Sequence, residues 1–410
     1  MEEFTCGEGI GAASAGNKRY RGKRKQDMDM DYGMQMTELS SAAYAAATAD
    51  GLSAQTAVTA LMEEVQIRSF RDMLAAFADV DGLRDRLVDG LCENDAARVR
   101  DSVDKKVRGW LSGKYQPTRR EDLMELCFIL RLDSRRADAF LAASGDAGLH
   151  WREPRELVYA FALEHGLRYP EAIALYERVK PGDLAGDGMA ESFTPLIRQE
   201  AQRCQTEDEL RQYLLSAAGK LGQLHNTAYQ HFMAMMQVLE APESSAGQDE
   251  RHYSTREIVE KYLDRNLPSA REGKKMEDKK RSVLADWPDE IILSRMKNRK
   301  VDVTRKVLIL LFLATDSGDE DEVDWEDDYS YDEDELPEED SAEAAFRSTH
   351  MRMNQMLADC GFRQLDPRNA FDWLVLYCMR VNADALDMDG LNEQLSHVLE
   401  VLFEAARPEE

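Results

Sequence analysis

Apolar residues recur at helical spacing along most of this chain. Between positions 107 and 132, for example, Leu123, Leu126 and Leu130 follow the three-and-four-residue period of an α-helix. The same period predicts further amphipathic helices over 134–143, 153–165, 169–179 and 194–239. No segment alternates clearly between apolar and polar residues as a strand would, so the pattern predicts an all-α fold.

The stretch 107–132 also contains residues that end one helix and begin another. Gly113 can adopt the positive φ with which helices often end, and Pro117 suits a connecting turn. Thr118, with Glu121 three residues later, has the pattern of a capping box. The sequence therefore predicts a helix, a tight turn and a second, capped helix.

This stretch resembles the helix-turn-helix domain of Cro/phage-repressor-like (XRE-type) regulators, whose recognition helix ends in a W-x-S-G-K-x-x-P-[ST] run like the one that starts at Trp110. Gly90 stands twenty residues before Trp110, at the usual distance of the Gly-Leu pair that opens helix 2 in such domains. The resemblance implies helix 1 over 68–88, helix 2 over 93–99 and helix 3 over 103–111. On this register we expect Trp110 and Leu123 to be buried.

The resemblance implies a DNA-binding transcriptional regulator. Helix 3, near 103–112, would enter the major groove of double-stranded DNA. Basic residues on this helix would lie near base edges or phosphates, and those at the start of the next helix would hold the DNA backbone. The expected DNA-binding residues are Lys105, Lys106, Arg108, Lys114, Arg119 and Arg120.

Some residues of the stretch depart from that family's pattern. The turn between helices 2 and 3, which is usually apolar, consists of Arg100, Asp101 and Ser102. Gly109 occupies a position where a DNA-contacting side chain is common, and Asp104 adds a negative charge. These departures favour an alternative, a non-enzymatic helical adaptor that binds a protein partner through degenerate helix-turn-helix units.

The chain contains an internal repeat. At an offset of 186, Lys114 aligns with Lys300, Thr118 with Thr304, and Arg119-Arg120 with Arg305-Lys306. At an offset of 216, Leu141, Gly145, Leu149 and Arg152 align with Leu357, Gly361, Leu365 and Arg368. Because the two offsets differ by 30 residues, we expect the acidic tract 316–340 to be an insertion between two helices of a second, diverged copy. The extended unit also resembles larger XRE-like proteins of Firmicutes.

The charge is unevenly distributed. The chain has a formal net charge of −27, and the tract 316–340 contains sixteen acidic residues and no basic one. By contrast, eight basic and two acidic residues make the segment 98–120 locally +6. Phosphate binding requires such a local basic surface rather than a positive net charge.

Motifs of enzymes and metal sites are missing from the sequence. The seven histidines form no H-E-x-x-H pattern, and the six cysteines form no C-x-x-C pair, which favours buried thiols in a reducing cytoplasm. No apolar run approaches the length of about 20 residues that spans a bilayer. We therefore expect a cytoplasmic protein without membrane contact, catalytic residues, metal or cofactor, with a homodimer possible.

These observations predict four segments. They are a disordered basic tail over 1–36, a helix-turn-helix-like helical domain over 37–180, a helical connector over 193–240, and a second helical repeat over 251–410 with an acidic loop over 316–345. In the second copy, Arg299 and Val303 stand where the first has Gly113 and Pro117.

Overall fold

The computed structural model confirms the predicted all-α fold. It describes residues 38–79, 81–117, 119–144, 147–181, 194–222, 225–241, 252–263, 267–268, 270–273, 276–316, 342–384 and 390–404. Within these residues the regular structure is helical, with an isolated antiparallel bridge between Ala147 and Phe362. The expected basic tail 1–36 and the acidic tract after Asp316 lie outside the described residues.

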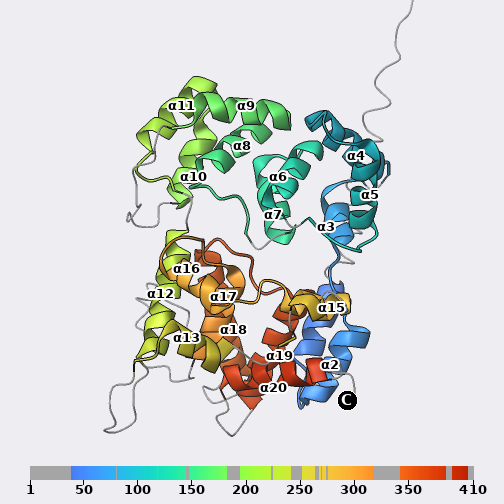
Figure 1. Ribbon diagram of the computed structural model, residues 1–410, viewed down its shortest axis with the longest axis vertical. Coiled ribbons are helices and arrows are strands. Elements are labelled where there is room, and N and C mark those ends of the chain that lie inside the picture. The colour runs from blue at the N-terminus through green and yellow to red at the C-terminus, as the bar shows by residue number, and fades with distance from the viewer. Residues whose placement is uncertain are drawn as a thin grey trace, which may run out of the picture.

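The first group of helices, called the first unit below, forms one half of the molecule (Figure 1). It comprises α3 (Phe70–Phe77), α4 (Leu83–Asn94), α5 (Arg100–Leu111), α6 (Arg120–Ile129), α7 (Ser134–Ser144), α8 (Pro154–Glu164), α9 (Tyr169–Val179), α10 (Thr194–Arg203) and α11 (Glu207–Ser216). Its core is continuous from Phe70 to Leu221 and includes Trp110 and Phe140. Trp110 and Leu123 are 1% and 5% exposed, so their predicted burial is confirmed.

The second unit forms the other half, below the first in Figure 1. It comprises helical residues 38–47, α2 (Ala54–Thr59), the π-helical turns η1 (Ala60–Glu64) and η2 (Val259–Leu263), α12 (Asn226–Glu240), α13 (Thr255–Ile258), α14 (Ala270–Gly273), α15 (Asp278–Leu284), α16 (Glu290–Lys297), α17 (Arg305–Thr315), α18 (Ala342–Asp359), α19 (Ala370–Asp384) and α20 (Leu391–Glu404). Phe232 and Trp373 lie at its centre.

The start of the folded chain packs against its end. Ala43 and Leu61 belong to the core of the second unit, and the indole N–H of Trp373 donates a hydrogen bond of 2.9 Å to the Ala43 carbonyl. Residues 43–65 therefore pack with the second unit and not with the rest of the helical domain that the sequence predicted over 37–180. It also divides the expected connector 193–240, because α10 and α11 join the first core whereas α12 joins the second.

The structure contains the repeat that the offset of 216 predicts. Helix α8 begins at Pro154 and α19 begins at Ala370, 216 positions later. The same offset relates two side-chain bonds that hold the preceding loops: the Asp138 carboxylate accepts from Leu149 N at 2.7 Å, and the Asn354 amide oxygen accepts from Leu365 N at 2.8 Å. The two units are therefore structural copies in this region.

The offset of 186 holds only as far as the end of α5. Gly113 and Arg299, 186 positions apart, both have positive φ, 71° and 54°. At the start of the next helix, however, Arg120 matches Arg305, since each begins its helix and binds a carboxylate of the helix after next. The predicted alignment of Arg119 with Arg305 is therefore wrong by one residue, because the turn before α17 is one residue shorter.

The helices expected from the family resemblance are only partly correct. Helix 3 is confirmed within α5, but 68–88 contains two helices, and α4 ends at Asn94 with Gly90 in its interior. The predicted helix 2 over 93–99 is wrong: residues 95–99 are not helical. The Asp95 carboxylate accepts a 3.0 Å bond from Ala97 N, and such a local side-chain bond competes with helix formation.

Two smaller expectations also change. The residue before α6 is Arg119, which makes no side-chain cap, and Thr118 lies outside the described residues. The acidic loop expected over 316–345 ends earlier, because residues from Ala342 onward form α18.

Candidate functional site

Helix α5 is amphipathic and holds three of the six predicted DNA-binding residues, Lys105, Lys106 and Arg108. Val103, Val107 and Trp110 face the core of the first unit. Lys105 and Arg108 lie on the opposite side and are exposed, whereas Lys106 is half-buried. The Lys106 ammonium lies 3.0 Å from Asp122 and 4.9 Å from the centre of the Trp110 ring, so much of its charge is neutralised within the unit.

Two carboxylates near the predicted residues, those of Asp104 and Glu121, are each shared by two arginines. Asp104 lies 2.6 Å from Arg84 and 3.1 Å from Arg108. In the same way Glu121, at the start of α6, lies 2.9 Å from Arg119 and 3.1 Å from Arg155. Each group of three side chains therefore keeps one net positive charge.

The turn after α5 folds back against that helix. Gly113 ends the helix with φ 71°, and the Tyr115 hydroxyl then donates a 3.1 Å bond back to the Lys105 carbonyl. Lys105 and Lys114 are exposed and have no carboxylate partner within the described residues. The surface formed by Lys105, Arg108 and Lys114 is called the α5 face below.

Gly109, which departs from the family pattern, has a packing role. A Cβ atom at this position would lie 2.1 Å from the Tyr115 ring. Glycine therefore allows the Tyr115 ring to cover α5 and fix the turn. The absence of a DNA-contacting side chain at this position is a consequence of that packing.

Arg120 has a different environment from the other five predicted residues. Its guanidinium makes an ion pair with Glu156, with one bond of 2.7 Å, and also donates to the carbonyls of Ala147 (3.2 Å) and Gly148. Burial alone would raise the pKa of Glu156, but the hydrogen bond and charge of Arg120 bring it below its ordinary value. Arg120 therefore braces α6 against the loop before α8.

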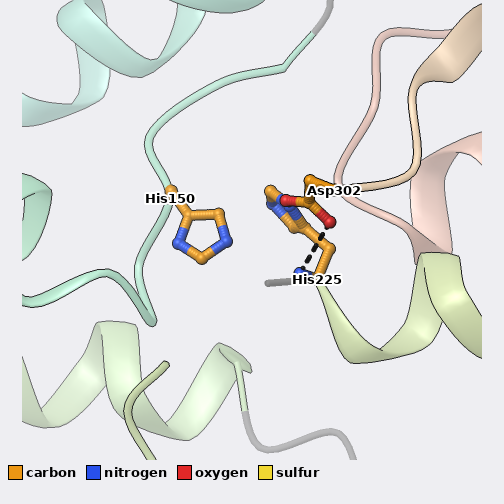
Figure 2. A group of neighbouring side chains, drawn as sticks. All are labelled: His150, His225 and Asp302. Carbon is orange, nitrogen blue, oxygen red and sulfur yellow. Dashed lines mark hydrogen bonds and ion pairs between the residues drawn. The ribbon is translucent and has the colours of Figure 1, made fainter. Parts of the chain in front are cut away.

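A second cluster, which the sequence analysis did not predict, lies between the two units (Figure 2). His150 comes from the loop before α8, His225 is the residue before α12, and Asp302 lies in the turn between α16 and α17. Their potential ligand atoms all lie within 4.8 Å of one another. The three residues come from separate segments with no motif spacing, so no sequence pattern could have revealed them.

Hydrogen bonds fix two members of this histidine cluster. Asp302 accepts from the backbone N–H of His225 at 3.0 Å, and its other oxygen lies 2.6 Å from His225 Nδ1. Burial alone would raise the pKa of Asp302, but the hydrogen bond and charge of His225 bring it below its ordinary value. Asp302 is therefore a carboxylate at neutral pH.

The third member, His150, is 7% exposed, and neither of its ring nitrogens has a hydrogen-bond partner. Its ring meets that of His225 edge to face, with 3.8 Å between the ring centres. Burial, together with the neighbouring His225, lowers the pKa of His150 to about 3. The imidazole is therefore neutral at physiological pH and keeps a lone pair available for a ligand.

Most of the described cysteines are buried thiols outside any disulfide. Cys127, Cys204, Cys360 and Cys378 are buried, and Cys92 is half-buried. Burial raises the pKa of the Cys127 and Cys360 thiols, so both stay protonated at neutral pH.

Comparison of the chain with protein-family models, curated proteins and solved structures gave no match. The XRE-type resemblance therefore rests on the residues of the stretch around Trp110. Within the described residues, every helix is too short or too polar to cross a bilayer.

Proposed function

We propose that this protein is a non-enzymatic, DNA-binding transcriptional regulator that contacts double-stranded DNA through the α5 face. The observation that supports this most strongly is the local excess of positive charge. Asp104 and Glu121 are each shared by two arginines, and Lys105 and Lys114 have no carboxylate partner among the described residues, although the chain has a net charge of −27.

The ion pairs on this surface do not prevent phosphate binding. Exposed ion pairs contribute only about 0–1 kcal/mol, so an arginine can exchange a carboxylate for a DNA phosphate at small cost. Arg108 and Arg119 are 56% and 70% exposed and are suited to this exchange. Lys106 would contribute less because of its bond to Asp122, and Arg120 would act by holding the start of α6 in place. The proposal locates the protein in the cytoplasm and is compatible with a homodimer.

A salt titration of duplex DNA binding tests the proposal. Fluorescence anisotropy of the full chain would be compared with that of the double variant Lys105→Ala/Lys114→Ala. We expect the variant to bind more weakly and the slope of log K against log salt to become shallower by about one to two units, because two phosphate contacts are lost. The charge-matched control is Lys180→Ala/Lys300→Ala, which removes two exposed lysines elsewhere. Equal affinity and slope for all three proteins would refute the proposal.

One observation favours the adaptor instead. In the second unit, α16 corresponds to α5, and Ile291 stands at the position of Lys105 and is 67% exposed. An exposed isoleucine suits contact with a protein partner better than contact with phosphate. If the parent chain fails to bind DNA at low salt, the adaptor becomes the better proposal.

A further inference from the structure

Two chain segments connect the units, and each is held in the same way. One segment runs from α11 to α12 and the other from η1 to α3. In each case an arginine from the loop before a helix, α8 or α19, donates through its Nε–H to a backbone carbonyl of the connecting segment. The backbone carbonyl of the same arginine accepts from the N–H of the connecting segment two residues after that carbonyl. The bonds are Arg152 to Lys220 (3.1 Å) with Gly222 to Arg152 (2.9 Å), and Arg368 to Gln66 (3.0 Å) with Arg68 to Arg368 (2.9 Å).

The residues beside these two arginines differ in chemistry. Asp366 lies two residues before Arg368, and its carboxylate makes a 3.4 Å ion pair with Arg68 of the connecting segment. At the equivalent position, 216 residues earlier, the chain has His150, which faces His225 of the other connecting segment. One junction is therefore closed by opposite charges, whereas two imidazoles meet at the other.

The second junction is incomplete in its hydrogen bonding. Both ring nitrogens of His150 are buried without a partner, and a buried polar atom without a partner is unfavourable because it has lost its bonds to water. The neighbouring groups, His225 and the Asp302 carboxylate, are held in place by their mutual bonds. Two imidazole nitrogens and a carboxylate oxygen within 4.8 Å form a donor set that a metal ion would satisfy.

We propose that a divalent transition-metal ion, Zn²⁺ in the first place, binds between the two units with His150, His225 and Asp302 as ligands. Nitrogen and oxygen donors of this kind suit Zn²⁺ better than Ca²⁺ or Mg²⁺, which prefer oxygen donors alone. The ligand atoms of tetrahedral Zn²⁺ lie about 3.3 Å apart, so the cluster needs only side-chain adjustment. Each imidazole ligates the ion through the ring nitrogen that carries its lone pair and keeps its one ring proton on the other nitrogen, so the ligands lose no proton.

Three protein ligands leave a fourth position of the tetrahedron for water. Because His150 belongs to the first unit whereas His225 and Asp302 belong to the second, the ion fastens the units together. It takes the role that the ion pair of Arg68 and Asp366 has at the other junction. This inference is independent of DNA binding.

Zinc binding to the full chain tests the proposal. Protein freed of metal with a chelator would be titrated with ZnCl₂ by calorimetry, and with Co²⁺ to follow the visible absorption of a tetrahedral ion. We expect one equivalent to bind and to raise the unfolding temperature. Loss of an outer ligand partner commonly costs 10–100-fold in metal affinity, so His150→Gln and His225→Gln should each weaken binding by at least about 100-fold.

The control variant is His397→Gln, which removes an exposed histidine of α20 and should bind zinc like the parent. Circular dichroism in chelator establishes that each variant is folded. If His150→Gln does not fold, Asp302→Asn and His225→Gln test the same site. Absence of stoichiometric zinc binding by the parent, or equal affinity in parent and ligand variants, would overturn the proposal.

Discussion

At the scale of single residues, the side chains around Trp110 determine the shape of the candidate DNA-binding surface. Trp110 packs edge to face against Phe70, with 6.1 Å between ring centres, and supports the half-buried Lys106 from below. The turn above it depends on Gly113, whose positive φ glycine adopts without steric cost.

Replacement of Trp110 by alanine tests this packing. We expect Trp110→Ala to lower the free energy of unfolding of the first unit by about 3–5 kcal/mol, because a fully buried ring is lost and a cavity remains. Urea unfolding followed by circular dichroism would measure it. Leu215→Ala, which truncates a side chain that is 57% exposed, is the control and should change stability by less than about 0.5 kcal/mol. A loss below about 1 kcal/mol for Trp110→Ala would contradict the assigned packing.

The burial of Leu123 and the turn at Gly113 were predictable because each has a strong local signal, apolar periodicity or conformational freedom, whereas the burial of Trp110 was predicted from the family register. Arg299 had no such signal. It adopts φ 54° although it is not glycine, and its guanidinium lies 4.3 Å from the centre of the Tyr229 ring. Its contacts with Tyr229 and Asn226 depend on the packing of α12, which no local pattern specifies.

At the scale of elements, each unit contains one arginine that braces two helices and a loop. Arg305 binds both oxygens of Asp372, at 2.8 and 2.9 Å, and donates to the carbonyls of Arg363 and Gln364. Arg120 has the equivalent position in the first unit. The side chain of Arg305 is 4% exposed and that of Arg120 is 37% exposed. Solvent therefore screens the ion pair of Arg120 with Glu156 far more than that of Arg305 with Asp372.

This difference predicts unequal effects of substitution. Arg305→Met removes the two short bonds from Arg305 and leaves the buried Asp372 carboxylate the 3.9 Å ion pair with Arg363 and the bond from Asp366 N. We expect a loss of about 3–5 kcal/mol in the free energy of unfolding. The double variant Arg305→Met/Asp372→Leu should recover most of that loss, and Arg120→Met should cost less than Arg305→Met. Thermal and urea unfolding would measure all three. If the double variant is no more stable than Arg305→Met, the loss of stability does not come from the ion pair of Arg305 and Asp372.

A half-buried histidine on α18, His350, predicts a dependence of stability on pH. His350 stacks on Phe346, its ring centre lies 6.1 Å from that of Tyr44, and burial lowers its pKa. Because the unfolded chain binds this proton below about pH 6.5, the stabilisation is complete above that pH and is lost as the pH falls. Relative to His350→Gln, the parent should lose up to about 1.4 kcal/mol per pH unit below pH 6.5. Parallel pH profiles for the two proteins would contradict the lowered pKa of His350.

The helical elements were largely predictable, but their ends were less so. Periodicity located α6 to α9, and the family resemblance located α5, whereas the helix 2 that the same resemblance implied was wrong. Asp95, which bonds to Ala97 N, marks the true boundary. That bond depends on the backbone conformation after α4, which the sequence alone does not specify.

At the scale of the whole molecule, the N-terminal helices complete the second unit. Helix α2 packs against α20, as α11 packs against α9 in the first unit. The sequence did not predict this arrangement, because no motif relates residues 38–64 to the distant end of the chain. The histidine cluster was hidden for the same reason, since its members meet only when the two units pack together.

Two truncations test whether the N-terminal helices complete the core of the second unit. Removal of residues 1–37 should leave thermal unfolding unchanged, because the sequence predicts a tail without periodic apolar residues there. Removal of residues 1–64 exposes the apolar surface around Trp373, so we expect loss of near-ultraviolet circular dichroism and binding of a hydrophobic dye. If the protein without residues 1–64 keeps a cooperative unfolding transition and binds no dye, the helices within residues 38–64 are dispensable.

The central claim, that the α5 face binds DNA, is tested most directly by selection of the full chain on a random pool of duplex DNA at moderate salt. The account predicts that repeated rounds enrich a defined sequence, and that Lys105→Ala/Lys114→Ala greatly weakens binding to it whereas Lys180→Ala/Lys300→Ala does not. Failure of the parent to retain any duplex above background, or equal retention by both double variants, would contradict it.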